Sequence, residues 1–286
     1  MKKIQLVLLT CILGLNNLYA AERECHGNRY EFCVGEKYYI YADIANIRTA
    51  PNVSSEIKFK FSAGQEVVIV SIAKDSEGEI DGVGGIWLLV STTDEEKNTG
   101  WIWSNSLSCK QLRRGNVKFV FGMDKYVKDK YKCTIKAVDN GKIVDRKSYE
   151  LYPDGTAFNN AKIIDNVWLE NVKYVVHLDL GGGACAFPTS NLYFAWLDEK
   201  KKLVELPPTF SVGDACAVSY GESLYVPSEN NGGMYNLLLK VTEEGIPPKD
   251  DKFACEYDKW DWKYKTELFK WNGEKVIIIK NNQIKK

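Results

Sequence analysis

Short runs of alternating apolar and polar residues, divided by turn residues, extend along most of the chain. Residues 172–180 (VKYVVHLDL) predict a strong strand, and residues 66–72 (EVVIVSI) form a near-continuous apolar run typical of a buried strand. Asn140-Gly141 stands between two alternating runs, which is the strongest short signal for a β-hairpin. The pattern therefore predicts an all-β chain.

A polar segment divides this pattern into two parts. Residues 109–114 (CKQLRR) are polar, and Gly115-Asn116 after them indicates a turn. We therefore expect a polar lead-in at 22–37 and a small β domain at 38–109. A larger antiparallel β domain, either a sandwich or a barrel, is expected at 115–286.

The first 21 residues have the layout of a secretory signal peptide. Two lysines precede an apolar run at 4–15, and two alanines at the end of the segment offer small residues for cleavage. The run is shorter than the roughly 20 residues that a membrane-spanning helix needs. We expect an exported protein, periplasmic or secreted, with no transmembrane segment after cleavage. A second interpretation makes Cys11 the lipid-bearing N-terminus of a lipoprotein.

Export favours disulfide bonds between the cysteines. One of the eight cysteines lies in the signal segment, so an odd number, seven, remains after cleavage and one thiol is left over. Either Cys25 pairs with Cys33, or one of the two is joined to Cys109, and the sequence leaves both pairings open. Cys185 is expected to pair with Cys216. The chain contains no CxxC and no CxC motif, so neither a redox pair nor a zinc knuckle is indicated, and no metal or cofactor is predicted.

Positive and negative side chains are balanced, with 38 Lys+Arg against 38 Asp+Glu and no basic block. Charge alone would therefore not capture nucleic acid or an anionic lipid surface. Neither is expected as a partner.

The residues of the chain predict no catalytic group. His177 and Asp179 alternate onto one face of their predicted strand, where a carboxylate could orient an imidazole for acid–base chemistry. Cys185 is the nearest thiol in the sequence, but the expected disulfide would remove it as a nucleophile. A polar pair on an outward strand face needs no function.

A set of residues in the first β domain resembles the bacterial SH3-like (SH3b) domain, a small half-open β-barrel. The set recurs in the order and spacing of that domain: Asn46-Ile47-Arg48, Pro51, Ser54-Ser55, Gly64 before a β-branched strand, Trp87 and Gly100-Trp101-Ile102. Most of these positions have a structural explanation, because Trp87 and Trp101 are large enough to fill much of a small barrel. The segment at 76–85 is longer and more acidic than the resemblance implies, and an exposed loop is expected there.

The SH3b resemblance implies a non-catalytic protein that attaches to peptidoglycan or to an envelope peptide or protein. Exposed aromatic side chains beside Arg48 would form a shallow groove for such a ligand, and the candidates are Tyr39, Tyr41 and Trp103. The alternative is a cell-wall hydrolase targeted by the SH3b domain, or a hydrolase inhibitor, with that activity in the C-terminal domain. This domain loosely resembles uncharacterised periplasmic all-β proteins, on the glycine-rich turn before Cys185 and on Trp271-Asn272-Gly273.

Overall fold

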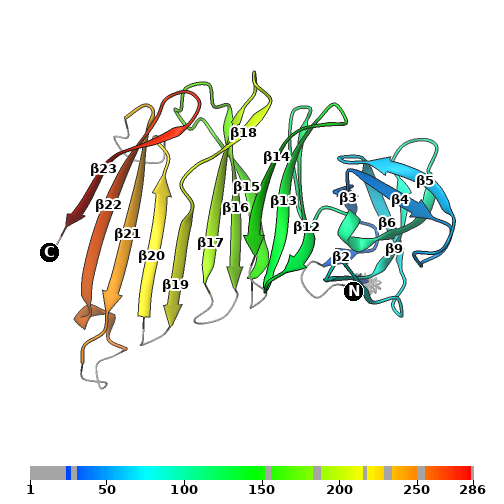
Figure 1. Ribbon diagram of the computed structural model, residues 1–286, viewed down its shortest axis with the longest axis horizontal. Coiled ribbons are helices and arrows are strands. Elements are labelled where there is room, and N and C mark those ends of the chain that lie inside the picture. The colour runs from blue at the N-terminus through cyan, green and yellow to red at the C-terminus, as the bar shows by residue number, and fades with distance from the viewer. Residues whose placement is uncertain are drawn as a thin grey trace, which may run out of the picture.

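The structure is a computed structural model that describes residues 24–26, 31–151, 156–182, 188–214, 218–228, 234–249 and 255–284. The predicted all-β fold is confirmed, because the described residues form antiparallel sheets joined by turns (Figure 1). The helical segments among them are two single turns, η1 (Ser104–Ser106) and η3 (Tyr257–Lys259). None of the described helical segments has the length and apolar character needed to cross a membrane. The predicted signal peptide and Cys11 lie outside the described residues.

The N-terminal part of the chain forms a six-stranded sheet around its own core. In sheet order its strands are β3 (Lys37–Tyr39), β6 (Glu66–Ile72), β9 (Trp87–Thr92), β10 (Thr99–Trp103), β4 (Ile44–Arg48) and β5 (Ile57–Ser62). Alternation decides which residues enter the core: in β4, Ala45 and Ile47 are buried and Ile44 and Asn46 are exposed. Burial of a side chain such as Ile47 contributes about 1.5–3 kcal/mol.

The lead-in closes on itself. Strands β1 (Cys25–His26) and β2 (Phe32–Cys33) pair antiparallel, and a disulfide joins Cys25 to Cys33. This is the first of the two pairings that the sequence left open. Phe32 belongs to the core of the six-stranded sheet, so the disulfide fixes the lead-in against that core.

The acidic segment at 76–85 is a hairpin and not the expected loop. Its strands are β7 (Gly78–Ile80), which is exposed, and β8 (Val83–Gly85). Asp81 and Gly82 both have positive φ, the geometry of a two-residue hairpin turn. Val83 is buried in the core of the next part of the chain, and the carbonyl of Asp81 accepts a hydrogen bond from the Tyr126 amide at 3.0 Å. The hairpin therefore connects the two parts.

A four-stranded sheet follows, with β11 (Gln111–Arg114), β12 (Val117–Val127), β13 (Lys130–Asp139) and β14 (Lys142–Leu151) in that order. The predicted hairpin at Asn140-Gly141 joins β13 to β14, and both turn residues have positive φ. The polar segment expected at the boundary is in part strand β11, which pairs with β12.

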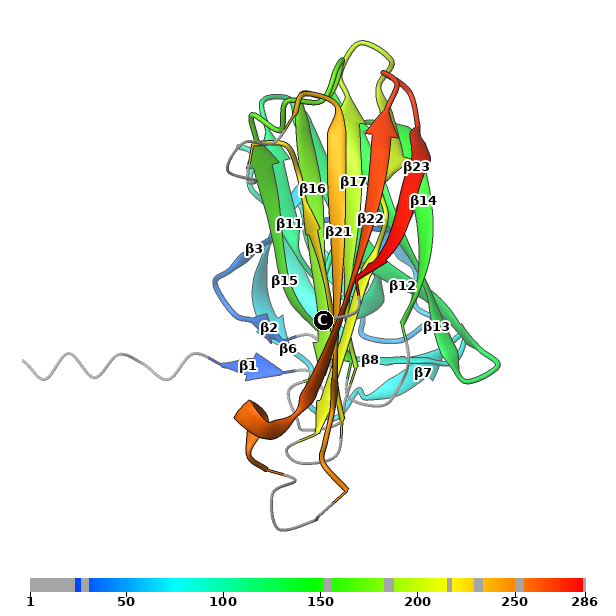
Figure 2. The ribbon, with the colours of Figure 1, turned by 90° about the vertical axis from the view of Figure 1, so that its left-hand side faces the viewer.

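The C-terminal part is a nine-stranded antiparallel sheet. Its strands are β15 (Thr156–Asp165), β16 (Tyr174–Gly182), β17 (Thr189–Leu197), β18 (Lys202–Glu205), β19 (Thr209–Asp214), β20 (Val218–Tyr225), β21 (Leu237–Ile246), β22 (Asp261–Trp271) and β23 (Val276–Ile284). Eight of them follow one another in chain order away from the six-stranded sheet, and β18 pairs with β17 off this row (Figure 1). Figure 2 shows the molecule from the end that carries β23.

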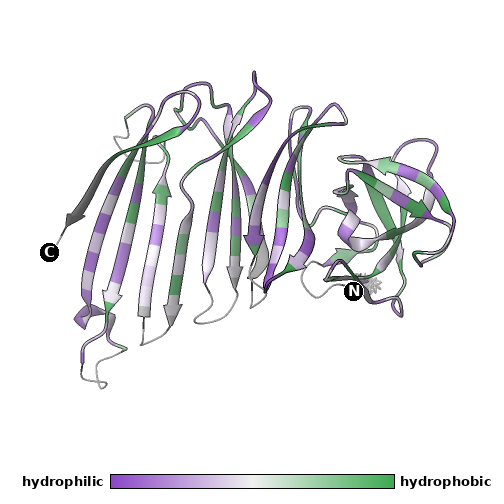
Figure 3. Cartoon of the chain, in the orientation of Figure 1, coloured by the Kyte–Doolittle hydropathy of each residue, from purple (hydrophilic) through white to green (hydrophobic). Residues whose placement is uncertain are grey.

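The nine-stranded sheet contributes to two apolar cores. On one face of β16, Tyr174, Val176 and Leu178 pack with buried residues of the four-stranded sheet. On the other face, Val175 packs with buried residues of β17, β20, β21 and β22. The alternation of apolar and polar residues along these strands is visible in Figure 3.

Candidate functional site

The four residues predicted to line a groove in the N-terminal domain do not form an open surface. Tyr39 is 6% exposed and Tyr41 is 3% exposed, because the four-stranded sheet covers both. Lys118 Nζ lies 4.5 Å from the centre of the Tyr39 ring, and Lys136 Nζ lies 3.9 Å from the centre of the Tyr41 ring. These tyrosines therefore join the two sheets through cation–π contacts.

The environment of Tyr41 is closely fitted. Its hydroxyl donates a hydrogen bond to Asp124 Oδ1 at 2.5 Å, and burial together with this bond raises the pKa of the Tyr41 hydroxyl above its usual value. Gly122 lies under the ring, where a Cβ atom would stand only 2.4 Å from it. Lys136 Nζ also donates to the carbonyl of Tyr41 at 2.8 Å and pairs with Asp43 at 2.9 Å. A ligand could reach this ring only if the sheets separated.

Trp103 and Arg48 are also engaged within the protein. Trp103 is 9% exposed and packs edge-on against Trp87, with 5.6 Å between the ring centres. Gly85 of the β7–β8 hairpin lies against its ring, where a Cβ atom would come within 2.8 Å. Arg48 Nη1 donates to the carbonyl of Ser55 at 2.6 Å and so holds the following loop. Trp87 is buried as expected, whereas Trp101 is half-buried.

The predicted Cys185–Cys216 pair lies outside the described residues. Cys255 is disulfide-bonded. Cys133 is a buried thiol in the core between the four-stranded and the nine-stranded sheets, and burial raises its pKa. A raised pKa keeps this thiol protonated, so Cys133 is an inert core residue.

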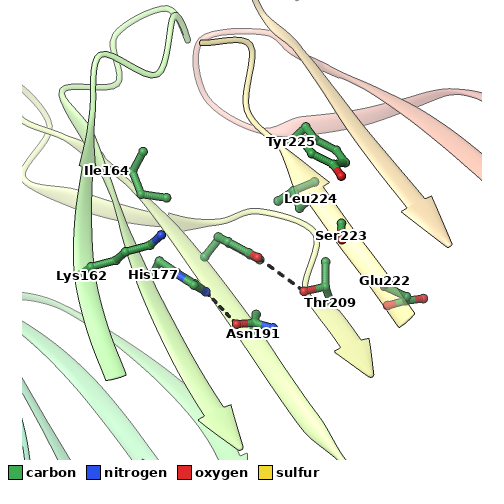
Figure 4. Close-up of a pocket in the computed structure, with 10 residues that line it drawn as sticks. Lys162, Ile164, His177, Asn191, Thr209, Glu222, Ser223, Leu224 and Tyr225 are labelled. Carbon is green, nitrogen blue, oxygen red and sulfur yellow. Dashed lines mark hydrogen bonds between the residues drawn. The ribbon is translucent and has the colours of Figure 1, made fainter. Parts of the chain in front are cut away.

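A polar pocket lies where the nine-stranded sheet divides. Both β18 and β19 pair with β17, at opposite ends of that strand, and Pro207 and Pro208 interrupt the chain between them. Strand β20 pairs with β19 as far as Gly221, and from Glu222 onward its described pairing is with β21. The pocket occupies about 410 Å³ between β15–β17 and the second half of β20 (Figure 4). Its lining residues are Lys162, Ile164, His177, Asn191, Tyr193, Thr209, Glu222, Ser223, Leu224 and Tyr225.

Strand alternation explains why polar groups meet at this place. Val175 and Leu224 belong to the second apolar core. His177 lies two residues after Val175 on β16, and Glu222 lies two residues before Leu224 on β20. Residues two apart in a strand share a face. The pocket is therefore the polar continuation of the apolar core, with Ile164 and Leu224 as its apolar lining.

Hydrogen bonds between the lining residues hold one wall of the pocket. His177 and Tyr193 are cross-strand neighbours, and their rings stack at 4.6 Å with an interplanar angle of 5°. His177 Nε2 lies 2.8 Å from Asn191 Oδ1; because an amide oxygen only accepts, Nε2 is the donor. The hydroxyl groups of Tyr193 and Thr209 are 3.5 Å apart. The predicted placement of His177 and Asp179 on one face agrees with the burial of Leu178 on the other face.

The carboxylate of Glu222 is fully used by neighbouring groups. It accepts hydrogen bonds from the Phe210 amide at 3.0 Å and from the Tyr220 hydroxyl at 2.6 Å, and it pairs with Lys240 at 2.8 Å. Burial raises the pKa of the Glu222 carboxyl, but the hydrogen bonds from Lys240 and Tyr220 and the charge of Lys240 outweigh it, so the pKa is lowered. Burial and the bond to Glu222 raise the pKa of Tyr220 to about 12. The Glu222 side chain thus accepts a hydrogen bond from the Phe210 amide of β19, just beyond the last backbone pair between β19 and β20.

One grouping of potential metal ligands occurs among the described residues, formed by Cys25, Glu31 and Cys33. Its two sulfur atoms are joined in the disulfide, so they are not thiolate ligands.

Of the residues that line the pocket, the sequence drew attention to His177 alone. Asn191, Thr209 and Glu222 carry no local signal, because the pocket depends on the division of the sheet between β18 and β20. No protein-family model, no curated protein and no solved structure matches this chain.

Proposed function

We propose that this chain is an exported, non-catalytic binding protein of the bacterial cell envelope, with an SH3b-like N-terminal domain and a ligand site in the nine-stranded sheet. The observation that carries the proposal is the pocket, whose histidine, amide and hydroxyl groups are held in place by one another before any ligand arrives. Its volume of about 410 Å³ lies in the range of about 300–1,000 Å³ that small-ligand sites occupy.

The state of the polar groups supports recognition over catalysis. Glu222 is saturated by three donors, so it is poorly placed to remove a proton from a substrate. His177 Nε2 is directed to Asn191 and not to a nucleophile. Groups fixed in this way lose little conformational entropy when they bind a ligand.

The SH3b-like domain has a supporting role in this proposal. Its aromatic residues Tyr39, Tyr41 and Trp103 pack inside the protein, and the contacts of Lys118 and Lys136 attach it to the four-stranded sheet. We assign ligand binding to the pocket and a structural role to these aromatic residues. The compartment follows from the signal-peptide layout of the first 21 residues.

The test is sedimentation of the mature chain, residues 22–286, with isolated peptidoglycan. Ser223→Phe enlarges an exposed side chain at the lining of the pocket, and Ser219→Phe is the matched control on the same strand and outside the pocket lining. We expect the wild type and Ser219→Phe to sediment with the wall and Ser223→Phe to remain in solution, at equal melting temperatures. Failure of the wild type to sediment would overturn the wall ligand, and sedimentation of Ser223→Phe would overturn the pocket.

A further inference from the structure

Four side chains that line the pocket, those of Lys162, Asn191, Ser223 and Tyr225, carry hydrogen-bond donors that a ligand can use. Lys162 Nζ makes no ion pair or hydrogen bond with any of the described residues, although it lines the pocket. Asn191 uses its oxygen for His177, which leaves the two N–H groups of its amide for a ligand. Ser223 and Tyr225 are exposed residues of β20 that also line the pocket, and each carries a hydroxyl group (Figure 4).

The one carboxylate among the lining residues, by contrast, is occupied. Both oxygens of Glu222 accept hydrogen bonds from Phe210, Tyr220 and Lys240. The charges of Glu222 and Lys240 cancel within a pair whose side chains are each only 13% exposed. Lys162 therefore remains as the uncompensated charge among the lining residues, and the pocket has a positive balance.

A donor-rich pocket with one uncompensated ammonium is complementary to a group that only accepts hydrogen bonds and carries a negative charge. We propose that the pocket binds the carboxylate of its ligand, with Lys162 as the counter-ion and the amide of Asn191 as the second donor. Charge-assisted hydrogen bonds of this kind are shorter and stronger than neutral ones. Ile164 and Leu224 give apolar contact to the part of the ligand that carries the carboxylate.

This inference rests on the proposed function, since it specifies the ligand chemistry of the same pocket. A carboxylate in the envelope can come from an acidic sugar or from the C-terminus of a short peptide. The two sources share the chemistry that the pocket recognises and differ in the remainder of the molecule.

The test is isothermal titration of the mature chain with two matched pairs of probes. One pair is glucuronic acid and its methyl ester, and the other is N-acetyl-alanyl-alanine and its C-terminal amide. We expect one of the two acids to bind, its neutral counterpart to bind at least about tenfold more weakly, and affinity to fall as sodium chloride is raised. The acid that binds identifies the source of the carboxylate.

Lys162→Gln removes the counter-ion, and Lys142→Gln on β14 is the matched control because Lys142 is exposed and outside the pocket. We expect Lys162→Gln to weaken binding of the acid at least about tenfold, and Lys142→Gln to leave it unchanged. Equal binding of acid and neutral probe, or an unchanged affinity in Lys162→Gln, would overturn the inference. If no acid binds while wall sedimentation still depends on Ser223, the carboxylate is excluded and the proposed function stands.

Discussion

Replacement of Lys136 by methionine should loosen the attachment of the six-stranded sheet to the four-stranded sheet. Lys136 is 5% exposed and lies between the two sheets, where its ammonium contacts the carbonyl of Tyr41, the Tyr41 ring and the carboxylate of Asp43. Methionine keeps the apolar stem and removes all three polar contacts. The change therefore isolates the contribution of the buried charge.

The magnitude follows from what each partner retains. The buried carbonyl of Tyr41 is left without this donor, which costs about 1–3 kcal/mol, and the lost cation–π contact costs about 0.5–2 kcal/mol. Asp43 is about half-exposed and keeps its ion pair with Arg146 at 2.8 Å. Loss of the Lys136–Asp43 ion pair therefore costs less than about 1 kcal/mol. Relief of the desolvated ammonium offsets part of this sum. A net destabilisation of about 2–3 kcal/mol remains, which lowers the melting temperature by roughly 5–10 °C.

The assay is thermal unfolding of residues 22–286 with the disulfides intact, monitored by tryptophan fluorescence. Lys142→Met is the control, because this exposed lysine at the start of β14 should change stability by less than about 0.5 kcal/mol. If Lys136→Met melted with the wild type, the interface would contribute no stability. The burial of Tyr39 and Tyr41 would then not explain why the predicted groove is closed.

Three further outcomes are expected. Replacement of both Cys25 and Cys33 by serine should lower the free energy of unfolding by about 2–3 kcal/mol, since the disulfide joins residues separated by 8 positions. An unchanged midpoint of urea unfolding would contradict this. Hydrogen bonds from Lys173 and Trp196 lower the pKa of Asp198 to about 2, so its stabilisation is present above about pH 4 and is lost as pH falls toward 2. The stability of Asp198→Asn should therefore fall less than that of the wild type between about pH 4 and pH 2. An equal dependence of stability on pH in the two proteins would refute the lowered pKa of Asp198. In zymography on embedded peptidoglycan the protein should give no clearing zone, and a zone abolished by His177→Ala would establish the hydrolase alternative.

Local pattern was sufficient to predict the strands and several of the turns. The runs at 66–72 and 172–180 became β6 and β16, and Asn140-Gly141 formed the hairpin between β13 and β14. Each of these signals depends on side chains within a few positions of one another. The pairing of Cys25 with Cys33, one of two alternatives, also joins residues close in sequence.

Surfaces that depend on contacts between distant segments could not be predicted in the same way. The sequence predicted Tyr39 and Tyr41 as exposed aromatic residues, but the local pattern carries no information about which segment covers them. Tyr41 lies beyond the end of β3, and residues 38–41 are all buried. The cover of Tyr39 and Tyr41 comes from β12 and β13, about 80–100 residues later in the chain. The segment at 76–85 likewise became a hairpin because Val83 enters a core built from strands far along the sequence.

The pocket shows the same limit. The pocket forms because β18 and β19 both pair with β17 and because the pairing of β20 with β19 ends before Glu222. Both conditions depend on the register of four strands. Lys162 and Ser223 are ordinary strand residues until the sheet brings them to opposite walls (Figure 4). His177 could be found from the sequence because alternation puts Asp179 on the same face of its strand.

The fraction of protein that sediments with peptidoglycan, compared between Ser223→Phe and Arg48→Ala, tests the central claim most directly. Ser223 lines the pocket, and Arg48 belongs to the groove that the SH3b resemblance implies. We predict that Ser223→Phe abolishes sedimentation and that Arg48→Ala sediments as the wild type does. Retention of binding in Ser223→Phe, with its loss in Arg48→Ala, would contradict the account and assign the ligand to the N-terminal domain.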